Sequence, residues 1–123
     1  MAQKILVVDD DKDLVFILKE TLQKYTYEVL TASNGVEALR ILKTNAVDLI
    51  LADLTMPEMT GWHFTMKVRQ DPRFLKTPII VLSGILQSDA DPEEYEAANA
   101  YMVKPFDIFK LLDKIKELLS KNV

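Results

Sequence analysis

The chain has 123 residues, 49% of them hydrophobic, which is the size of one domain with a substantial core and leaves no length for a second domain. Its formal net charge of -4 argues against direct nucleic-acid binding, because neutralising phosphates requires clustered Lys and Arg. The chain contains no cysteine, which excludes disulfides, iron-sulfur clusters and thiolate chemistry.

Short apolar runs alternate with segments of helical spacing. The runs lie at residues 5–8, 49–52, 79–82 and 101–103, and a further brief strand is expected at 28–31. Unbroken apolar runs of this length are typical of strands buried on both faces, and such strands form parallel sheets covered by helices. The first run is too short for a signal-peptide core or a membrane span, so we expect a cytoplasmic protein that does not enter a membrane.

Two helices are expected between the first three strands. Asp11 is placed to cap the first helix, and Asn34 to start the second. The apolar stripe of the first helix is expected to contain Leu14, Ile17, Leu18 and Leu22.

The third helix is expected to follow the turn at residues 56–61 and to reach about Arg69. We expect Trp62 to be partly exposed in this helix and His63 to be a surface residue. A short fourth helix is predicted to start at residues 91–94, where a capping Asp is followed by Pro.

The final helix is expected to run from about Phe106 to Lys121, with Phe106 and Phe109 in the core first and on a partner surface second. Strands and helices that alternate in this way predict a three-layer α/β sandwich, since right-handed crossovers place helices on both faces of a parallel sheet.

Four of the expected strands end on a chemically reactive side chain. These residues are Asp9 and Asp10 after the first strand, Asp53 after the third, Ser83 after the fourth and Lys104 after the fifth. In open α/β sheets the ligand site lies beyond the carboxyl ends of the strands. The sequence therefore predicts that three carboxylates, a hydroxyl and an ammonium group converge at one edge of the sheet.

The three carboxylates indicate a metal site. Packing Asp9, Asp10 and Asp53 together raises their Coulomb energy unless a cation lies among them. Oxygen ligands without His or Cys favour a hard cation, and a few carboxylates with waters suit Mg²⁺ better than Ca²⁺.

The remaining two residues suit a phosphoryl group. Lys104 is a compact cation that could bind a phosphoryl oxygen, or it could only neutralise the acidic cluster. Ser83 offers a hydroxyl donor, or it could be an ordinary helix or turn cap. An aspartate can accept a phosphoryl group to form an acyl phosphate, so the set predicts phosphoryl chemistry with an Asp nucleophile.

With these residues in hand, the chain closely resembles the receiver domain of two-component response regulators, in particular the single-domain chemotaxis type. The resemblance extends from about Lys4 to Leu119 and rests on four ordered motifs, LVVDD at 6–10, DLTMPEMTG at 53–61, VLSG at 81–84 and YMVKPF at 101–106. It implies a single receiver domain over residues 1–123 with a flavodoxin-like (βα)5 fold and the strand order 2-1-3-4-5.

The resemblance also implies the metal ligands and the partner. Asp10 and Asp53 would bind Mg²⁺ directly, with Mn²⁺ as an alternative ion. The backbone carbonyl of Thr55 would be a further ligand, and Asp9 would act largely through water. Asp53 would receive its phosphoryl group from a sensor histidine kinase or a histidine phosphotransfer protein.

A conformational switch is implied as well. Lys104 would pair with the phosphoryl group, Ser83 would bind one of its oxygens, and Tyr101 would be the switch aromatic that turns inward behind Ser83. Tyr101 could also be an ordinary strand aromatic. The Lys104-Pro105 peptide is expected to be cis. The output face would be the fourth helix, fifth strand and fifth helix, in a monomer or a weak phosphorylation-dependent homodimer.

Two positions would set the lifetime of the phosphoryl group, Thr55 and Ile85. Because an apolar Ile85 cannot orient a hydrolytic water, we expect slow self-dephosphorylation.

Two other functions compete with the switch. A metal-dependent phosphatase of the haloacid dehalogenase class also uses an Asp nucleophile, but it needs an Asp where this chain has Thr55. A receiver-like scaffold that takes no phosphate is disfavoured, because the site positions all hold competent side chains.

Overall fold

The computed structural model describes residues 2–54, 56, 58–83 and 97–120. Its centre is a parallel five-stranded sheet in the order β2-β1-β3-β4-β5, as the resemblance implied. The strands are β1 at Lys4–Val8, β2 at Glu28–Ala32, β3 at Leu49–Asp53, β4 at Ile79–Ser83 and β5 at Ala100–Val103.

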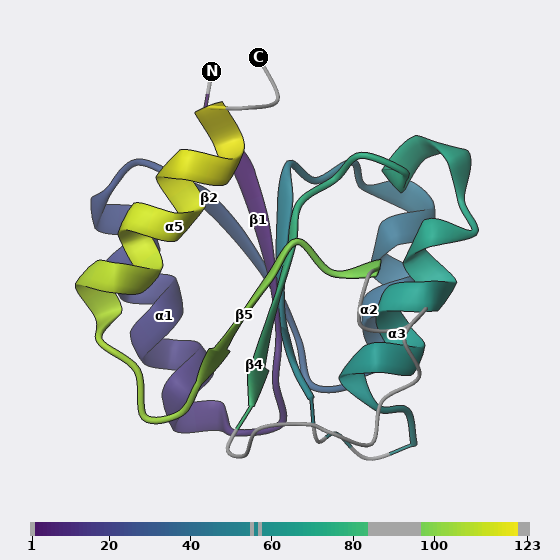
Figure 1. Ribbon diagram of the computed structural model, residues 1–123, viewed down its shortest axis with the longest axis horizontal. Helices are drawn as coiled ribbons and strands as arrows, with labels where there is room; N and C mark the ends of the chain where they lie inside the picture. Colours follow the sequence, from purple (N-terminus) through teal and green to yellow (C-terminus); the bar gives the residue numbers. More distant parts are fainter. Residues whose placement is uncertain (1, 55, 57, 84–96, 121–123) are drawn as a thin grey trace.

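Helices cover both faces of the sheet, which confirms the predicted three-layer α/β sandwich (Figure 1). They are α1 at Lys12–Lys24, α2 at Gly35–Thr44, α3 at Gly61–Arg69 and α5 at Ile108–Ser120, with a short 3-10 helix, η1, at Pro72–Phe74. The fourth helix predicted from residues 91–94 lies outside the described residues. None of the helices that the structure describes is long and apolar enough to span a membrane.

The helix starts follow from polar caps. The Asp11 side chain accepts hydrogen bonds from backbone N–H groups in the first turn of α1, and Asn34 does the same for α2. Thr60 caps α3 by accepting from the N–H of His63 at 3.1 Å. The predicted caps Asp11 and Asn34 are therefore confirmed, and His63 is exposed as expected.

Two hydrophobic cores lie on either side of the sheet because alternate strand residues point to opposite faces. In β1, Leu6 and Val8 contact the layer of α2 and α3, whereas Ile5 and Val7 contact the layer of α1 and α5. All four side chains are fully buried. Strands that are apolar on both faces therefore form the middle of the sandwich, as their unbroken apolar runs predicted.

Three predictions about side-chain exposure were wrong. Ile17 is 54% exposed and Phe109 is 64% exposed, whereas Trp62 is only 5% exposed. The buried stripe of α1 is narrow and leaves Ile17 on its solvent side. Trp62 turns into the core shared with α2.

The last helix also begins later than predicted. Asp107 accepts a hydrogen bond from the N–H of Phe109 at 2.8 Å, so α5 starts at Ile108 and not near Phe106. This start places Phe109 in the first turn, on the solvent side of the helix. The buried face is formed by Leu111, Leu112, Ile115, Leu118 and Leu119.

A single arginine joins α3 to the chain around β4 and β5. The Arg69 guanidinium donates to the carbonyl oxygens of Phe74 and Thr77, both at 2.6 Å. It also donates to the carbonyl oxygen of Ala97 at 3.0 Å and to Oδ1 of Asn99 at 2.8 Å. Burial lowers the pKa of Arg69 below its usual value, and these acceptors replace the lost water.

Replacing Arg69 by Met should lower the free energy of unfolding by about 3 kcal/mol, because several partly buried carbonyl groups lose a charged donor. Urea denaturation of both proteins measures the difference. Arg40→Met is the matched control, since Arg40 is exposed, and it should change stability by less than about 0.5 kcal/mol. Equal stabilities of the two variants would contradict the structural role of Arg69.

Candidate functional site

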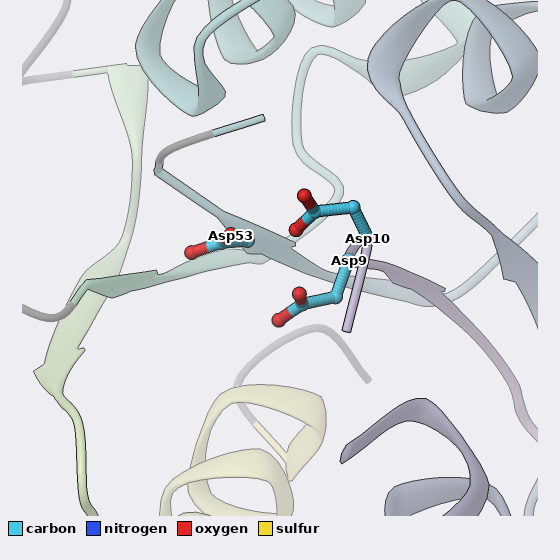
Figure 2. Close-up of side chains that lie close together, drawn as sticks. All are labelled: Asp9, Asp10 and Asp53. Carbon is cyan, nitrogen blue, oxygen red and sulfur yellow. The ribbon is translucent and has the colours of Figure 1, made fainter. Parts of the chain in front are cut away.

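Three carboxylates meet at the carboxyl edge of the sheet, as the sequence predicted. Asp9, Asp10 and Asp53 each place one carboxylate oxygen within 4.8 Å of the others. Figure 2 shows Asp9 and Asp10 side by side beyond the end of β1, with Asp53 beside them on β3. Asp9 and Asp53 are buried, at 2% and 6% exposure, whereas Asp10 is exposed.

Strand pairing positions the buried carboxylates. The N–H of Asp9 donates to the carbonyl of Ala32 at 3.1 Å, which continues the β1–β2 ladder by one residue. The Oδ1 atom of Asp9 accepts a hydrogen bond from the N–H of Asp11 at 2.9 Å. Asp53 is the last residue of β3 and pairs in register with Leu82 of β4. Both side chains are therefore held by backbone geometry.

Lys104 crosses from beyond β5 to join the two buried carboxylates. Its Nζ atom lies 2.9 Å from Oδ2 of Asp9 and 3.3 Å from Oδ1 of Asp53. Partial burial by itself lowers the pKa of Lys104, but the hydrogen bond to Asp9 and the charges of both aspartates outweigh it, so the pKa is raised. Lys104 is thus a cation that two buried carboxylates hold in position. The Lys104-Pro105 peptide is cis, as expected.

The donor set fits a hard divalent cation. Three carboxylates and one ammonium group leave a formal charge of about -2 at the site. Among the described residues, Lys104 forms no ion pair with Asp10. Oxygen donors of this kind suit Mg²⁺.

The structure describes only two of the other predicted site residues, Ser83 and Tyr101. Ser83 ends β4 one position beyond the residue that pairs with Asp53, so its backbone lies at the same edge. Tyr101 lies on β5 opposite Val81 and is 39% exposed. Thr55 and Ile85 lie outside the described residues.

A close backbone contact that sequence reasoning missed shapes the turn after Asp53. The N–H of Gly61 donates to the carbonyl of Leu54 at 2.7 Å. A Cβ atom on Gly61 would lie 2.4 Å from the carbonyl oxygen of Asp53 and 2.8 Å from Cα of Leu54. Position 61 has no room for a side chain, so glycine is required there. The glycine in the DLTMPEMTG motif was the signal, but its reason appears only when α3 is packed against β3.

Comparison with known proteins identifies the family. The model of the response regulator receiver domain matches residues 5–116. The chain is a response regulator receiver domain. Its sheet order and acidic cluster agree with this family, whose members bind Mg²⁺ at an Asp cluster and are phosphorylated by histidine kinases. Receiver domains act in signalling and are not classical enzymes, so the phosphatase alternative gains no support.

Individual relatives differ in how much of their length the receiver domain covers. This chain is 39% identical to the chemotaxis protein CheY1 of Helicobacter pylori, and the match covers 97% of this chain and 98% of CheY1. It is 34% identical to the alkaline phosphatase synthesis transcriptional regulatory protein PhoP of Bacillus subtilis, over 99% of this chain but only 50% of PhoP.

A solved structure that contains Mg²⁺ and BeF has the same fold. The response regulator TrrA of Thermotoga maritima, in complex with Mg²⁺ and BeF, superposes with a TM-score of 0.85 at 35% identity. The alignment covers 94% of this chain and 98% of TrrA.

Gly61→Ala should lower the free energy of unfolding by about 3 kcal/mol, because the new methyl group meets backbone atoms that cannot move aside. Chemical denaturation measures the loss. Gly35→Ala is the matched control. Its methyl group would lie 3.0 Å from Sδ of Met59, a flexible side chain that can rotate away, so the change should stay below about 1 kcal/mol. Equal losses for the two variants would rule out the steric account.

Proposed function

We propose that this receiver domain is a phosphorylation switch in which Asp53 accepts a phosphoryl group from a sensor histidine kinase or a histidine phosphotransfer protein. The observation that carries the proposal is the bridge from Lys104 to both Asp9 and Asp53. It places a fixed cation beside the carboxylate that would become an acyl phosphate. The chain's membership of the family supports this choice of partner and acceptor.

The transfer is a displacement at phosphorus. One carboxylate oxygen of Asp53 forms a bond to phosphorus as the bond between phosphorus and the donor imidazole nitrogen breaks. The imidazole leaves with that electron pair and takes up a proton. Lys104 moves from the carboxylate to a phosphoryl oxygen, and Ser83 donates a hydrogen bond to another.

The acidic residues would hold the metal. Asp10 and Asp53 are the proposed direct ligands together with the backbone carbonyl of Thr55, and Asp9 acts through water. Mg²⁺, or Mn²⁺ in its place, would supply positive charge that stabilises the negative charge of the transferred phosphoryl group. The support is the donor chemistry of the cluster and its remaining negative charge.

The output would use the face formed by the predicted fourth helix, β5 and α5, of which the fourth helix lies outside the described residues. In the described part of this face, Tyr101 and Val103 are 39% and 40% exposed, and Phe109 is 64% exposed. Exposed apolar side chains of this size are available for a protein contact. We propose that Tyr101 is the switch aromatic and that the domain is a monomer or a weak phosphorylation-dependent homodimer.

The setting of the domain is also a proposal. Residues 1–123 form a single receiver domain that acts in the cytoplasm without binding nucleic acid itself. Its near-complete overlap with CheY1 is compatible with a stand-alone regulator, and its half coverage of PhoP with a part of a longer one. The only catalysis would be assistance to its own phosphorylation and dephosphorylation.

Incubation with Mg²⁺ and acetyl phosphate should add one phosphoryl group to the wild type and none to Asp53→Asn, because the amide lacks the nucleophilic oxygen. Intact-mass spectrometry measures the gain, and omission of Mg²⁺ should suppress it. Asp48→Asn, an exposed residue at the opposite edge of the sheet, is the control and should be phosphorylated normally. An unmodified wild type would indicate a scaffold. Turnover of added phosphate esters without a gain in mass would indicate a phosphatase.

The acyl phosphate should persist for minutes or longer, because an apolar Ile85 offers no hydrogen bond to an attacking water. Ile85→Asn should shorten its half-life by about tenfold, which corresponds to one hydrogen bond of about 1.4 kcal/mol in the transition state. Loss of the phosphorylated mass with time measures both half-lives. A wild-type half-life of seconds would contradict the assigned role of Ile85.

A further inference from the structure

A groove separates the carboxyl-terminal halves of α2 and α3, far from the acidic cluster. Its volume is about 220 Å³. Figure 1 shows the end of α3 and the following connection at the top of the right-hand helix layer, whereas the strands end at the bottom. The floor is apolar and consists of Leu39, Leu42, Val68 and Phe74. The groove is thus an additional surface feature and not part of the phosphoryl site.

Two lysines give the rim a positive charge. Lys43 and Lys67 are exposed and form no ion pair with any residue that the structure describes. The carboxylate on the rim, Asp71, is already bound by Arg73 at 2.7 Å. Internal pairing therefore neutralises the acidic member and leaves the lysines unmatched, on a chain whose net charge is -4.

Arg73 is held in place between this groove and a second one. Its Nη2 atom donates to the carbonyl oxygen of Leu42 at 2.9 Å, and its guanidinium carbon lies 4.8 Å from the centre of the Phe74 ring. Arg73 also lines an adjoining pocket of about 240 Å³ beside Val47 and Pro78. Arg73 is thus shared by the linings of both hollows.

We infer that this groove is a docking site for an acidic segment of a partner protein that inserts an apolar side chain between α2 and α3. An apolar floor beneath unmatched lysines complements a chain that carries carboxylates around a leucine or a similar residue. Lysines near helix ends also interact favourably with the helix dipole. The interaction with the helix dipole accounts for the position of the lysines but not for the apolar hollow between the two helices. A small inorganic anion would leave the apolar floor unfilled, so a segment that carries an apolar side chain fits the groove better.

Fluorescence anisotropy with a labelled peptide that has one leucine between runs of glutamate tests the site. The full chain should bind this peptide, and should bind a version with serine in place of leucine more weakly. Lys43→Glu combined with Lys67→Glu should weaken binding by about tenfold or more, because attractions become repulsions. Amide NMR shifts on binding should include Leu42, Val68 and Phe74.

The matched control is Lys24→Glu combined with Lys116→Glu, which makes the same charge change on exposed lysines of α1 and α5. It should change the affinity by less than about twofold, because these charges lie in the other helix layer, across the sheet from the groove, where salt screens them. Urea unfolding checks that both double variants fold. If the variant with Glu at positions 43 and 67 does not fold, Lys43→Gln combined with Lys67→Gln replaces it. Absence of binding, equal weakening by both pairs or NMR shifts elsewhere would overturn the inference.

Discussion

The hydrogen-bonded ion pairs of Lys104 with Asp9 and Asp53 are the interaction on which the functional site depends. Both aspartates are buried, and two like charges so close together raise each other's energy in a medium less polar than water. The lysine offsets this repulsion and joins the carboxyl ends of three strands, because Lys104 follows β5, Asp9 follows β1 and Asp53 ends β3. The ion pairs thereby link segments that lie far apart in the sequence.

In the proposed switch, the same cluster would couple phosphorylation to a local change in the fold. A phosphoryl group on Asp53 would draw Lys104 away from Asp9 and recruit Ser83 at the end of β4. Both Lys104 and Ser83 adjoin the β4–β5 pair, and Ser83 is in register with Val103. In the proposed switch, charge rearrangement at the sheet edge would act first on the β4–β5 pair and, through it, on the exposed side chains of β5.

The opposite edge of the sheet is built for rigidity. Arg69 binds three carbonyl oxygens and the Asn99 side chain, and Asn99 in turn accepts from the N–H of Ile79. These contacts tie α3 to the starts of β4 and β5. The carboxyl edge is held instead by the ion pairs of Lys104. The groove beside Arg73 lies at the edge that Arg69 holds.

Sequence patterns alone predicted a large part of this protein. Unbroken apolar runs indicated parallel strands buried on both faces, and the reactive residues after them indicated a shared site, because carboxyl ends of parallel strands meet at one edge. Local caps such as Asp11 were predictable since their hydrogen bonds span only a few residues. The family motifs supplied the strand order, which the residues themselves left open.

Only the tertiary structure decided features that depend on which faces meet. Periodicity placed Phe109 and Ile17 near an apolar face, but the packing of α5 and α1 leaves both exposed and buries Trp62 instead. The requirement for Gly61 and the reach of Arg69 depend on atoms many residues away. The sequence therefore determined the elements and the chemistry at their ends, because these are local. Packing decided exposure, steric fit and long-range contacts, because these depend on several elements at once.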